Sequence, residues 1–211
     1  MLSSLVERLN DRRRADEEVG EDAGFTLIEL MVVLLIMAIL LAIAIPTFLG
    51  VTGSANDRAA QSNLNTALTS AKGVYESNQQ SYPATATVIS DIQSDEPSLS
   101  VVSDPGSTAS IAAGDIGVDV SAGGNGVVLF SLAKKTNECW WVADNTQAIA
   151  NGKSTTSPAL PWTASGNGIP NTAGDYYGVF KLSSTTYCDI NDIGQTPSSQ
   201  VKTSGFPPAA P

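Results

Sequence analysis

The acidic residue Glu29 lies at the mouth of a long apolar segment. Sixteen uninterrupted apolar residues, Leu30 to Ile45, follow it, and no Lys or Arg lies between Phe25 and Asn56. An acidic side chain at the centre of a bilayer costs roughly 3 kcal/mol, so ionisable groups in such segments usually have a function. A cut after Gly24 would create a positively charged amino group on Phe25. The amine of a neighbouring copy of the chain could then pair with Glu29.

The residues around this carboxylate resemble a known processing signal. Gly24, followed by Phe-Thr-Leu-Ile-Glu and an apolar helix, is similar to the class III signal of type IV prepilins, and Pro46 falls where many members carry a proline. The resemblance extends over about residues 20 to 82. It implies cleavage between Gly24 and Phe25 by a membrane-bound prepilin peptidase, and N-methylation of Phe25. It also implies assembly into a helical filament, in which Phe25, Glu29 and Pro46 take part.

Two other interpretations of the apolar segment remain open. An ordinary signal peptide has a small-residue cleavage site after its apolar region, and Ala42-Ile43-Ala44 would meet that requirement. Glu29, and the helical pattern that continues beyond the apolar run, argue against removal of the segment. The other alternative is a single, uncleaved membrane anchor.

The composition excludes several classes of function. Without residues 1–24, the 211-residue chain carries seven basic and fourteen acidic side chains, a balance that disfavours the phosphate backbone of nucleic acids. We therefore expect no direct nucleic-acid partner. The chain has no His, which excludes histidine-based acid–base catalysis and His-ligated metal sites. No motif places a nucleophile–base pair or a carboxylate dyad, so we expect neither an enzyme nor a cofactor.

The two cysteines, Cys139 and Cys188, lie forty-nine residues apart. This separation is not the spacing of a metal-ligand motif. In an exported domain we expect the two to form a structural disulfide, which would contribute roughly 4 kcal/mol in the chain-entropy model. Two buried free thiols are the alternative. A catalytic cysteine is not expected, because no His is available to activate it.

The resemblance and the hydrophobic pattern divide the chain into four segments. The leader, 1–24, would be removed, and its cluster Arg12-Arg13-Arg14 would hold the N-terminus in the cytoplasm. Residues 25–50 are long enough to span a bilayer, which takes about 20 apolar residues, and would form the membrane or filament-core half of one helix. Residues 51–82 would continue that helix as an amphipathic half. Residues 83–211 would form a β headpiece with a variable loop and a disulfide-bounded C-terminal region.

The long helix is expected to have one weak point and two unlike faces. Pro46 lacks a backbone N–H and its ring crowds the carbonyl of Ala42, so we expect a kink or a local loosening there. Beyond the membrane, apolar residues at a spacing of three and four indicate one buried face, formed by Leu64, Ala67, Leu68, Ala71, Val74 and Tyr75. The opposite face, expected to meet solvent or neighbouring subunits, carries Asp57, Arg58, Gln61, Asn65, Lys72 and Glu76.

The headpiece is predicted to contain an antiparallel sheet of about four strands. Residues 127–132 and 138–143 are apolar, β-prone and separated by a turn, which indicates one hairpin. Residues 176–182 and 186–190 indicate a second hairpin. With one face of this sheet on the helix, the fold class is α+β, and the arrangement resembles the type IV pilin fold. Between helix and sheet we expect a helical or extended piece near residues 88–92, a strand at 99–102 and a turn-rich loop with Asp115 and Asp119.

Two further features invite a functional interpretation. Adjacent aromatic residues on a strand point to opposite faces, so we expect one of Trp140 and Trp141 in the core and the other outward, and likewise for Tyr176 and Tyr177. The residues from Asp189 to Gly194 loosely resemble a calcium loop but lack its full pattern, and we expect an Asx-type turn. The tail after Gly194 is expected to be flexible or loosely laid on the surface.

The resemblance therefore implies a type IV pilin. Its precursor would cross the cytoplasmic membrane once with the N-terminus inside, and the processed chain would polymerise with copies of itself into a surface filament. Its partners would be the prepilin peptidase and the pilus assembly platform with its ATPase. The filament would serve adhesion, surface motility or DNA uptake. The alternatives are a pseudopilin of a type II secretion or competence system and, more remotely, a monomeric membrane-tethered binding protein.

Overall fold

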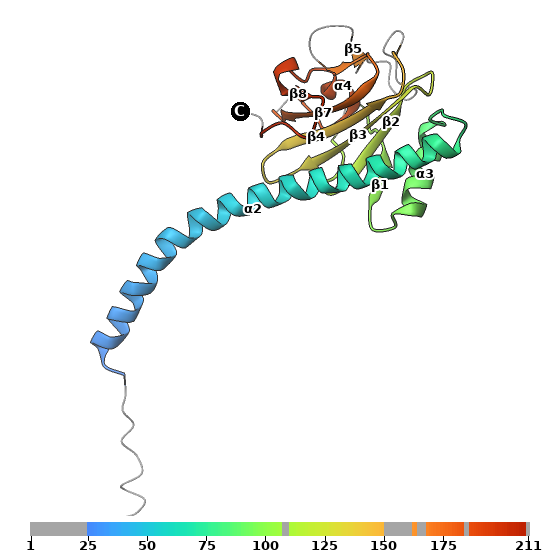
Figure 1. The fold of residues 1–211 in the computed structure, drawn as a ribbon. Helices are drawn as coiled ribbons and strands as arrows, with labels where there is room; N and C mark the ends of the chain where they lie inside the picture. Colours follow the sequence, from blue (N-terminus) through green and yellow to red (C-terminus); the bar gives the residue numbers. More distant parts are fainter. Residues whose placement is uncertain (1–24, 107–109, 150–161, 164–167, 184–185, 210–211) are drawn as a thin grey trace, which may run out of the picture. The chain divides into compact units, whose positions relative to one another are not determined.

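The computed structural model describes residues 25–106, 110–149, 162–163, 168–183 and 186–209 (Figure 1). It divides the chain into one unit that ends at Phe48 and a second that begins at Leu49. Several expectations concern residues outside the described ranges. These are the leader 1–24, with Gly24 and the arginine cluster, and part of the connection between residues 176–182 and 186–190.

The first described element is the helix α2, Leu27–Ser77. Its first half is rich in Leu, Ile, Met and Ala, and most of these residues favour a helix through side chains that lose little freedom in it. The helix ends about five residues before the expected end at residue 82. Gln79 and Gln80 adopt left-handed backbone conformations, with φ of 56° and 58°, which a helix cannot continue.

The buried face of the second half of α2 largely follows the sequence pattern. Leu64, Ala67, Leu68, Ala71 and Val74 are buried as expected, and Tyr75 is half-buried. The prediction that Asp57 lies on the outward face is wrong. Asp57 is 9% exposed, and its Oδ1 accepts hydrogen bonds from Thr136 Oγ1 at 2.5 Å and from Trp140 Nε1 at 3.3 Å. Two donors from the sheet therefore satisfy a carboxylate that the periodicity alone places outside.

Six strands form one mixed sheet behind α2, in the order β1-β2-β3-β4-β7-β8 (Figure 1). They are β1 Ser100–Ser103, β2 Asp115–Val120, β3 Gly126–Ala133, β4 Glu138–Asn145, β7 Gly174–Lys181 and β8 Val201–Lys202. β1 and β2 are parallel, and all other neighbours are antiparallel. A separate parallel pair consists of β5 Trp162–Thr163 and β6 Ile169–Pro170. The short helices are α3 Thr85–Asp95, α4 Ile190–Ile193 and the 3₁₀ turn η2 Ser198–Gln200.

The α+β class and the packing of the long helix on the sheet are confirmed. The predicted hairpin of residues 127–132 and 138–143 is confirmed as β3 and β4, and the strand near 99–102 is β1. The second predicted hairpin is wrong, because residues 186–189 form no strand and α4 begins at Ile190. Asp115 and Asp119 also lie in a strand, β2, instead of a loop.

The sheet is buried on both faces, which the sequence analysis did not foresee. Trp140 belongs to the core beneath α2 and α3, whereas Trp141 belongs to a second core on the opposite face. Both indole rings are at most 1% exposed. Tyr176 is buried in the second core and Tyr177 is half-buried against the first. The members of each pair lie on opposite faces, as expected. The expectation that one tryptophan points outward is wrong, because a second layer of chain covers the far face, whereas Tyr177 remains partly exposed.

Two glycines make room for the rings on the far face. Gly178 pairs with Trp141 across β4 and β7, and Gly117 pairs with Phe130 across β2 and β3. A Cβ atom would lie 2.2 Å from the Trp141 ring at Gly178, and 2.3 Å from the Phe130 ring at Gly117. Each large ring thus lies over a strand position that has no side chain, as glycines in strands often allow.

The C-terminal tail is packed against the sheet. β8 pairs with Tyr177 and Gly178 of β7. The Phe206 ring then lies edge-on to Trp140 and Tyr177, with ring centroids 5.8 and 5.2 Å away. The expectation of a loose tail is wrong for this part of the chain, since Phe206 is held by two aromatic partners in a favourable geometry.

Candidate assembly site

A reciprocal pair of hydrogen bonds opens the long helix. Glu29 Oε2 accepts from Thr26 N at 2.9 Å and from Thr26 Oγ1 at 2.7 Å. In return, Glu29 N donates to Thr26 Oγ1 at 3.3 Å. A threonine and a glutamate three residues apart that exchange such bonds form a capping box, which satisfies backbone donors at a helix N-terminus.

The capping box gives Glu29 a role within its own chain. Both bonds to the carboxylate use the same oxygen, Oε2. Among the described residues, no hydrogen bond or ion pair reaches Oε1. Phe25, whose amine is the expected partner from another copy, is 83% exposed. Sequence reasoning missed this local role, although the T-x-x-E pattern before an apolar run was there to indicate it.

The helix that follows the capping box is apolar on all sides. All large exposed apolar side chains of the described residues lie between Phe25 and Val51, and each is at least 48% exposed. α2 is the one described helix long and apolar enough to cross a membrane, judged by length and composition. A signal sequence near an N-terminus would meet the same criterion.

Pro46 lies inside α2 without interrupting it. The residues on both sides of Pro46 remain helical in the single chain, so the expected loosening is not seen there. Thr47 Oγ1 donates to the carbonyls of Ile43 at 3.1 Å and Ala44 at 2.9 Å. In apolar helices, side-chain hydroxyl groups donate hydrogen bonds to backbone carbonyls near a proline, which satisfies polar groups that the proline leaves without a partner.

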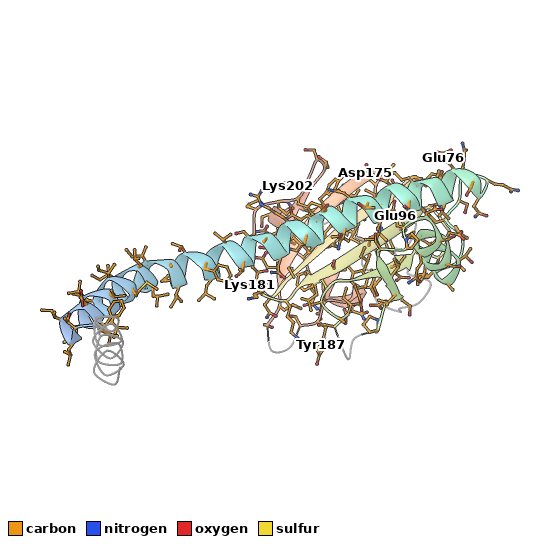
Figure 2. All side chains as sticks on the ribbon, turned by 90° about the horizontal axis from the view of Figure 1, so that it is seen from below. Glu76, Glu96, Asp175, Lys181, Tyr187 and Lys202 are labelled. Carbon is orange, nitrogen blue, oxygen red and sulfur yellow. A yellow bond between two sulfur atoms is a disulfide. The ribbon has the colours of Figure 1, made fainter. Side chains whose placement is uncertain are left out.

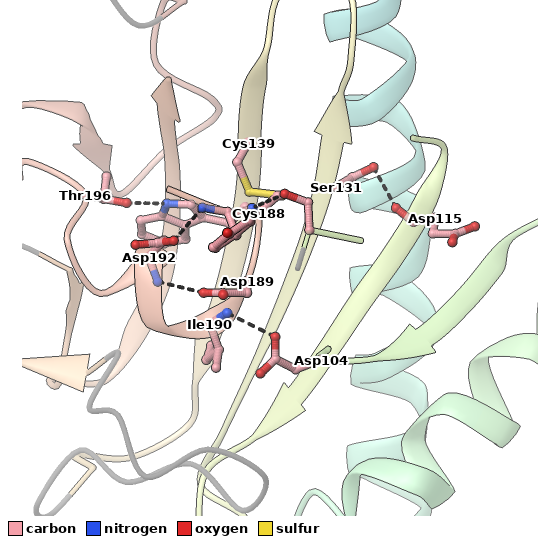
Figure 3. Close-up of a disulfide and its surroundings, with 12 residues drawn as sticks. Asp104, Asp115, Ser131, Cys139, Cys188, Asp189, Ile190, Asp192 and Thr196 are labelled. Carbon is pink, nitrogen blue, oxygen red and sulfur yellow. Dashed lines mark hydrogen bonds between the residues drawn. A yellow bond between two sulfur atoms is a disulfide. The ribbon is translucent and has the colours of Figure 1, made fainter. Parts of the chain in front are cut away.

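Cys139 and Cys188 form a disulfide with a Cα–Cα distance of 5.4 Å (Figure 3). Both residues are fully buried. The bond ties the beginning of β4 to the segment that precedes α4 on the far face of the sheet. Around it, Ile111 N donates to the Cys188 carbonyl at 3.3 Å, and Cys188 N donates to Ser110 Oγ at 3.0 Å. The disulfide thus fixes the layer that covers Trp141.

Next to the disulfide, Asp189 caps the short helix α4. Its Oδ1 accepts from the backbone N–H groups of Asn191 and Asp192, both at 2.8 Å, which is the Asx-type turn expected from the sequence. Asp189 is fully buried, and its Oδ2 has no hydrogen-bond partner among the residues that the structure describes. Burial, together with the nearby carboxylates of Asp192 and Asp104, raises the pKa of Asp189 to about 6.

The raised pKa predicts that Asp189 makes the headpiece less stable as the pH rises. Its carboxyl group holds a proton in the folded state up to about pH 6, but only up to about pH 4 when unfolded. The contribution of Asp189 to the free energy of unfolding is therefore complete below pH 4 and declines between pH 4 and 6. By linkage, this contribution amounts to about 2–3 kcal/mol. Asp189→Asn keeps the capping oxygen and should lack this part of the pH dependence in urea unfolding measured from pH 4 to 7. Equal slopes for both proteins would contradict the assignment.

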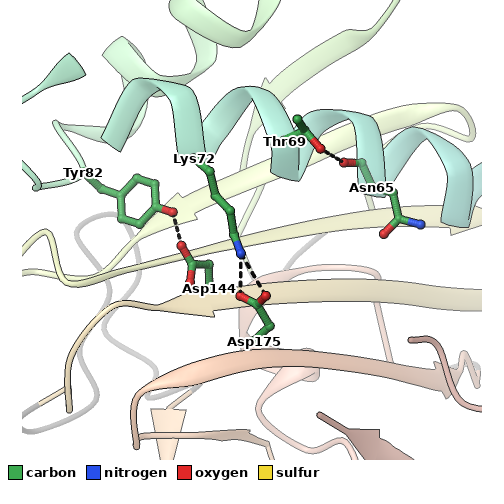
Figure 4. Close-up of polar contacts among 6 residues, drawn as sticks. All are labelled: Asn65, Thr69, Lys72, Tyr82, Asp144 and Asp175. Carbon is green, nitrogen blue, oxygen red and sulfur yellow. Dashed lines mark hydrogen bonds and ion pairs between the residues drawn. The ribbon is translucent and has the colours of Figure 1, made fainter. Parts of the chain in front are cut away.

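A polar network joins α2 to strands β4 and β7 at its other end (Figure 4). Lys72 Nζ contacts both carboxylate oxygens of Asp175, at 2.9 and 2.8 Å. Asp175 is directly opposite Asp144 in the β4–β7 register, and Tyr82 donates its hydroxyl proton to Asp144. Burial raises the pKa of Asp144, although the Tyr82 hydrogen bond and the Lys72 charge oppose it. Lys72 is therefore a tertiary contact and not, as predicted, part of a solvent-facing surface.

We expect Lys72→Met to destabilise the headpiece by about 1 kcal/mol at pH 7. Without the cation, two carboxylates would face each other across neighbouring strands, which is unfavourable. The cost should shrink as the pH falls, because burial raises the pKa of Asp144 and this carboxyl group takes up a proton first. Lys202→Met is the matched control, since no ion pair of Lys202 is found in the described part of the chain. Denaturant unfolding at pH 7 and pH 4 measures the difference, and an equal cost for the two variants would refute this role.

The structure brings together only part of the expected site. It places Thr26 on Glu29 and joins the two cysteines. Gly24 lies outside the described residues, and a single chain contains no neighbouring Phe25 amine. The Lys72–Asp175 pair and the buried Asp189 were not foreseen. The cross-strand register that puts Asp144 beside Asp175 could not be obtained from local patterns.

A comparison with protein families identifies the N-terminal region. Residues 21–45 match the model of the prokaryotic N-terminal methylation motif. This match spans the expected cleavage junction, Glu29 and most of the apolar half of α2. Neither the comparison with curated proteins nor that with solved structures found a match to the chain. The motif indicates a structural subunit anchored in a membrane as a precursor, and together with the long helix and the α+β headpiece it fits a prepilin, a type IV pilin-like protein.

Proposed function

We propose that this chain is a structural subunit of a type IV pilus. A prepilin peptidase would cleave it between Gly24 and Phe25 and methylate the new amine of Phe25. The pilus assembly platform with its ATPase would then draw the processed chain from the membrane into a filament of identical subunits. The headpiece, residues 83–211, would form the outer shell of that filament and serve adhesion, motility or DNA uptake.

The observation that carries this proposal is the unpartnered apolar surface of α2. Every large apolar side chain from Phe25 to Val51 is exposed in the single chain. An apolar surface of that size normally marks contact with a membrane or with other protein chains. A membrane would cover it in the precursor, and the same helices of neighbouring subunits would cover it in a filament. Small residues such as Ala38, Ala42 and Ala44 allow helices to approach closely in an apolar environment.

Glu29 distinguishes a filament subunit from a simple anchor. In a simple anchor the carboxylate would serve only as the capping partner of Thr26. In a filament, the unoccupied Oε1 of Glu29 could accept the methylated Phe25 amine of the next subunit while Oε2 stays in the capping box. The attraction between two charges grows as water is excluded, so this pair would set the register of subunits in the apolar core.

The experiment that tests the proposal is an intact-mass and N-terminal fragment analysis of the protein in fibres sheared from cells. A species that begins at N-methylated Phe25, recovered in sedimentable fibres, is the expected result. Full-length protein that stays in the membrane fraction with residues 1–24 attached would refute processing and favour a tethered monomer. Processed protein without surface fibres would instead favour a pseudopilin of a secretion or competence system.

A further inference from the structure

The positive charges of the second unit gather at one end. Of the six Lys and Arg residues described between Leu49 and the C-terminus, Lys72 alone is half-buried in an ion pair. The other five are exposed and form what we call the basic end: Arg58, Lys134, Lys135, Lys181 and Lys202. Figure 2 shows Lys181 and Lys202 at one end of this unit, whereas Asp175, Glu96 and Glu76 lie toward the end at which α2 finishes.

Hydrogen bonds and strand pairing bring most of these cations together from separate elements. Lys134 and Lys135 lie on the turn between β3 and β4, whose Thr136 bonds to Asp57, the neighbour of Arg58 on α2. The same turn contacts the end of β7, where Leu182 N donates to the Asn137 carbonyl at 2.8 Å. Lys181 precedes Leu182 and pairs with Glu138 across the β4–β7 register.

The acidic groups of this region do not cancel the charge at its surface. Asp57 and Glu138 are 9% and 3% exposed, so both carboxylates lie beneath the exposed cations. Asp192, which lines a hollow with Lys181, is 7% exposed and accepts from Tyr187 N and from Gln195. Asp115 at the beginning of β2 is half-buried. The outer surface of the basic end is therefore positive on a headpiece that is otherwise acidic.

Arg58 and the turn that carries Lys134 and Lys135 lie close to the part of α2 at which its exposed apolar side chains end. Val51 is the last of the exposed large apolar side chains of α2, and Arg58 lies seven residues further, about 10 Å along the helix axis. The headgroup layer on each side of a bilayer is about 5–7 Å thick. If the apolar side chains up to Val51 occupy the hydrocarbon, Arg58 lies within one Debye length, about 8–10 Å, of the lipid phosphates.

We propose that the basic end docks the headpiece on anionic lipid headgroups while the chain is a membrane-bound precursor. This inference rests on the membrane anchoring in the proposed function. The acidic remainder of the headpiece would be repelled by the same surface, so docking fixes one orientation. Tethering by α2 makes the contact intramolecular, and a weak attraction per cation is therefore sufficient. Nucleic acid is the less favoured partner, because it would have to bind from solution against the net negative charge of the chain, without the tether that α2 provides to a membrane.

The test uses the full-length chain in proteoliposomes made of phosphatidylcholine alone or with about one third phosphatidylglycerol. A water-soluble lysine acylating reagent is added, and the modification of each lysine is followed by mass spectrometry. We expect Lys134, Lys135 and Lys181 to react at least about threefold more slowly in the anionic vesicles. Lys72, at the other end of α2, is the internal control and should react equally in both. Raising the salt to about 0.5 M should abolish the protection.

Two matched double variants sharpen the test. Lys134→Gln with Lys135→Gln should remove most of the lipid-dependent protection of Lys181. Gln93→Glu with Ser94→Glu lowers the net charge by the same amount on the exposed end of α3 and should leave that protection unchanged. Loss of protection in both double variants would show a dependence on net charge alone and would overturn the proposal.

Other outcomes would refute lipid docking or show that the basic end binds a different partner. Equal acylation in the two kinds of vesicle would overturn lipid docking. Protection by added duplex DNA in neutral vesicles, without protection by anionic lipid, would show a nucleic-acid surface instead. Protection that grows with protein density in neutral vesicles would show a contact between copies of the chain. Protein that does not float with the vesicles after alkaline carbonate extraction would refute membrane anchoring, and lipid docking with it. Protein that floats but shows no protection of its lysines would refute docking alone.

Discussion

A chain that carries Glu29→Gln is expected to be inserted and cleaved normally, yet to yield at least about a hundredfold fewer fibres. Glutamine keeps the acceptor that the capping box needs, so the beginning of α2 should be unchanged. The negative charge, however, is lost, and the Phe25 amine of the next subunit would remain unpaired in an apolar core. Breaking a buried ion pair from one side typically costs about 3–5 kcal/mol. Quantifying processed protein in sheared fibres and in the membrane fraction measures the effect.

A matched variant separates the charge of Glu29 from its capping role. Thr26→Val removes the hydroxyl that exchanges hydrogen bonds with Glu29 but leaves the carboxylate free to meet another subunit. Loss of a cap costs about 1 kcal/mol, so we expect fibre yield to fall severalfold at most. Normal fibres from Glu29→Gln would rule out pairing with the Phe25 amine. An equal defect in both variants would assign Glu29 to helix capping instead.

The second large effect is expected from removal of the disulfide. Replacing Cys139 and Cys188 by alanine releases a loop of forty-nine residues, for which the chain-entropy model predicts a loss of about 4 kcal/mol. In a domain of this size such a loss lowers the melting temperature by about 10 °C. The cost should fall on the layer over Trp141, so near-UV circular dichroism of the tryptophans should change with it.

Reduction provides the control for this comparison. A reductant should lower the melting temperature of the natural chain to that of the double alanine variant, and it should not affect the variant. A loss below about 1 kcal/mol would show that the far layer holds itself in place by packing alone.

Sequence patterns predicted the elements that depend on neighbouring residues. The spacing of Leu64, Ala67, Leu68 and Ala71 identified the buried face of α2, and the apolar runs of β3 and β4 identified a hairpin, because each depends on neighbours in sequence. Thr186 to Asp189 were mistaken for a strand. The sequence pattern of β-prone residues around a buried cysteine is the same whether the segment pairs with a strand or is held by a disulfide.

The errors concern contacts between distant segments. Asp57 was placed outside because its partners, Thr136 and Trp140, come from a turn and a strand about eighty residues later in the chain. Lys72 was assigned to solvent for the same reason, as Asp175 lies 103 residues away. One of the two tryptophans was expected outside, because nothing near Trp140 and Trp141 in sequence shows that a later segment covers the far face. The motif at Gly24 to Glu29 depends on no such partner, and a family comparison recognised the same region.

The two buried faces of the sheet affect which amino-acid substitutions this fold can accept. Side chains around Trp140 pack against α2, whereas those around Trp141 pack against the segment that the disulfide holds, and the backbone of the strands separates them. Substitutions on one side share few partners with those on the other, so their energetic effects should simply add. The layer that the disulfide holds could then change in sequence without changes in the face on which α2 packs.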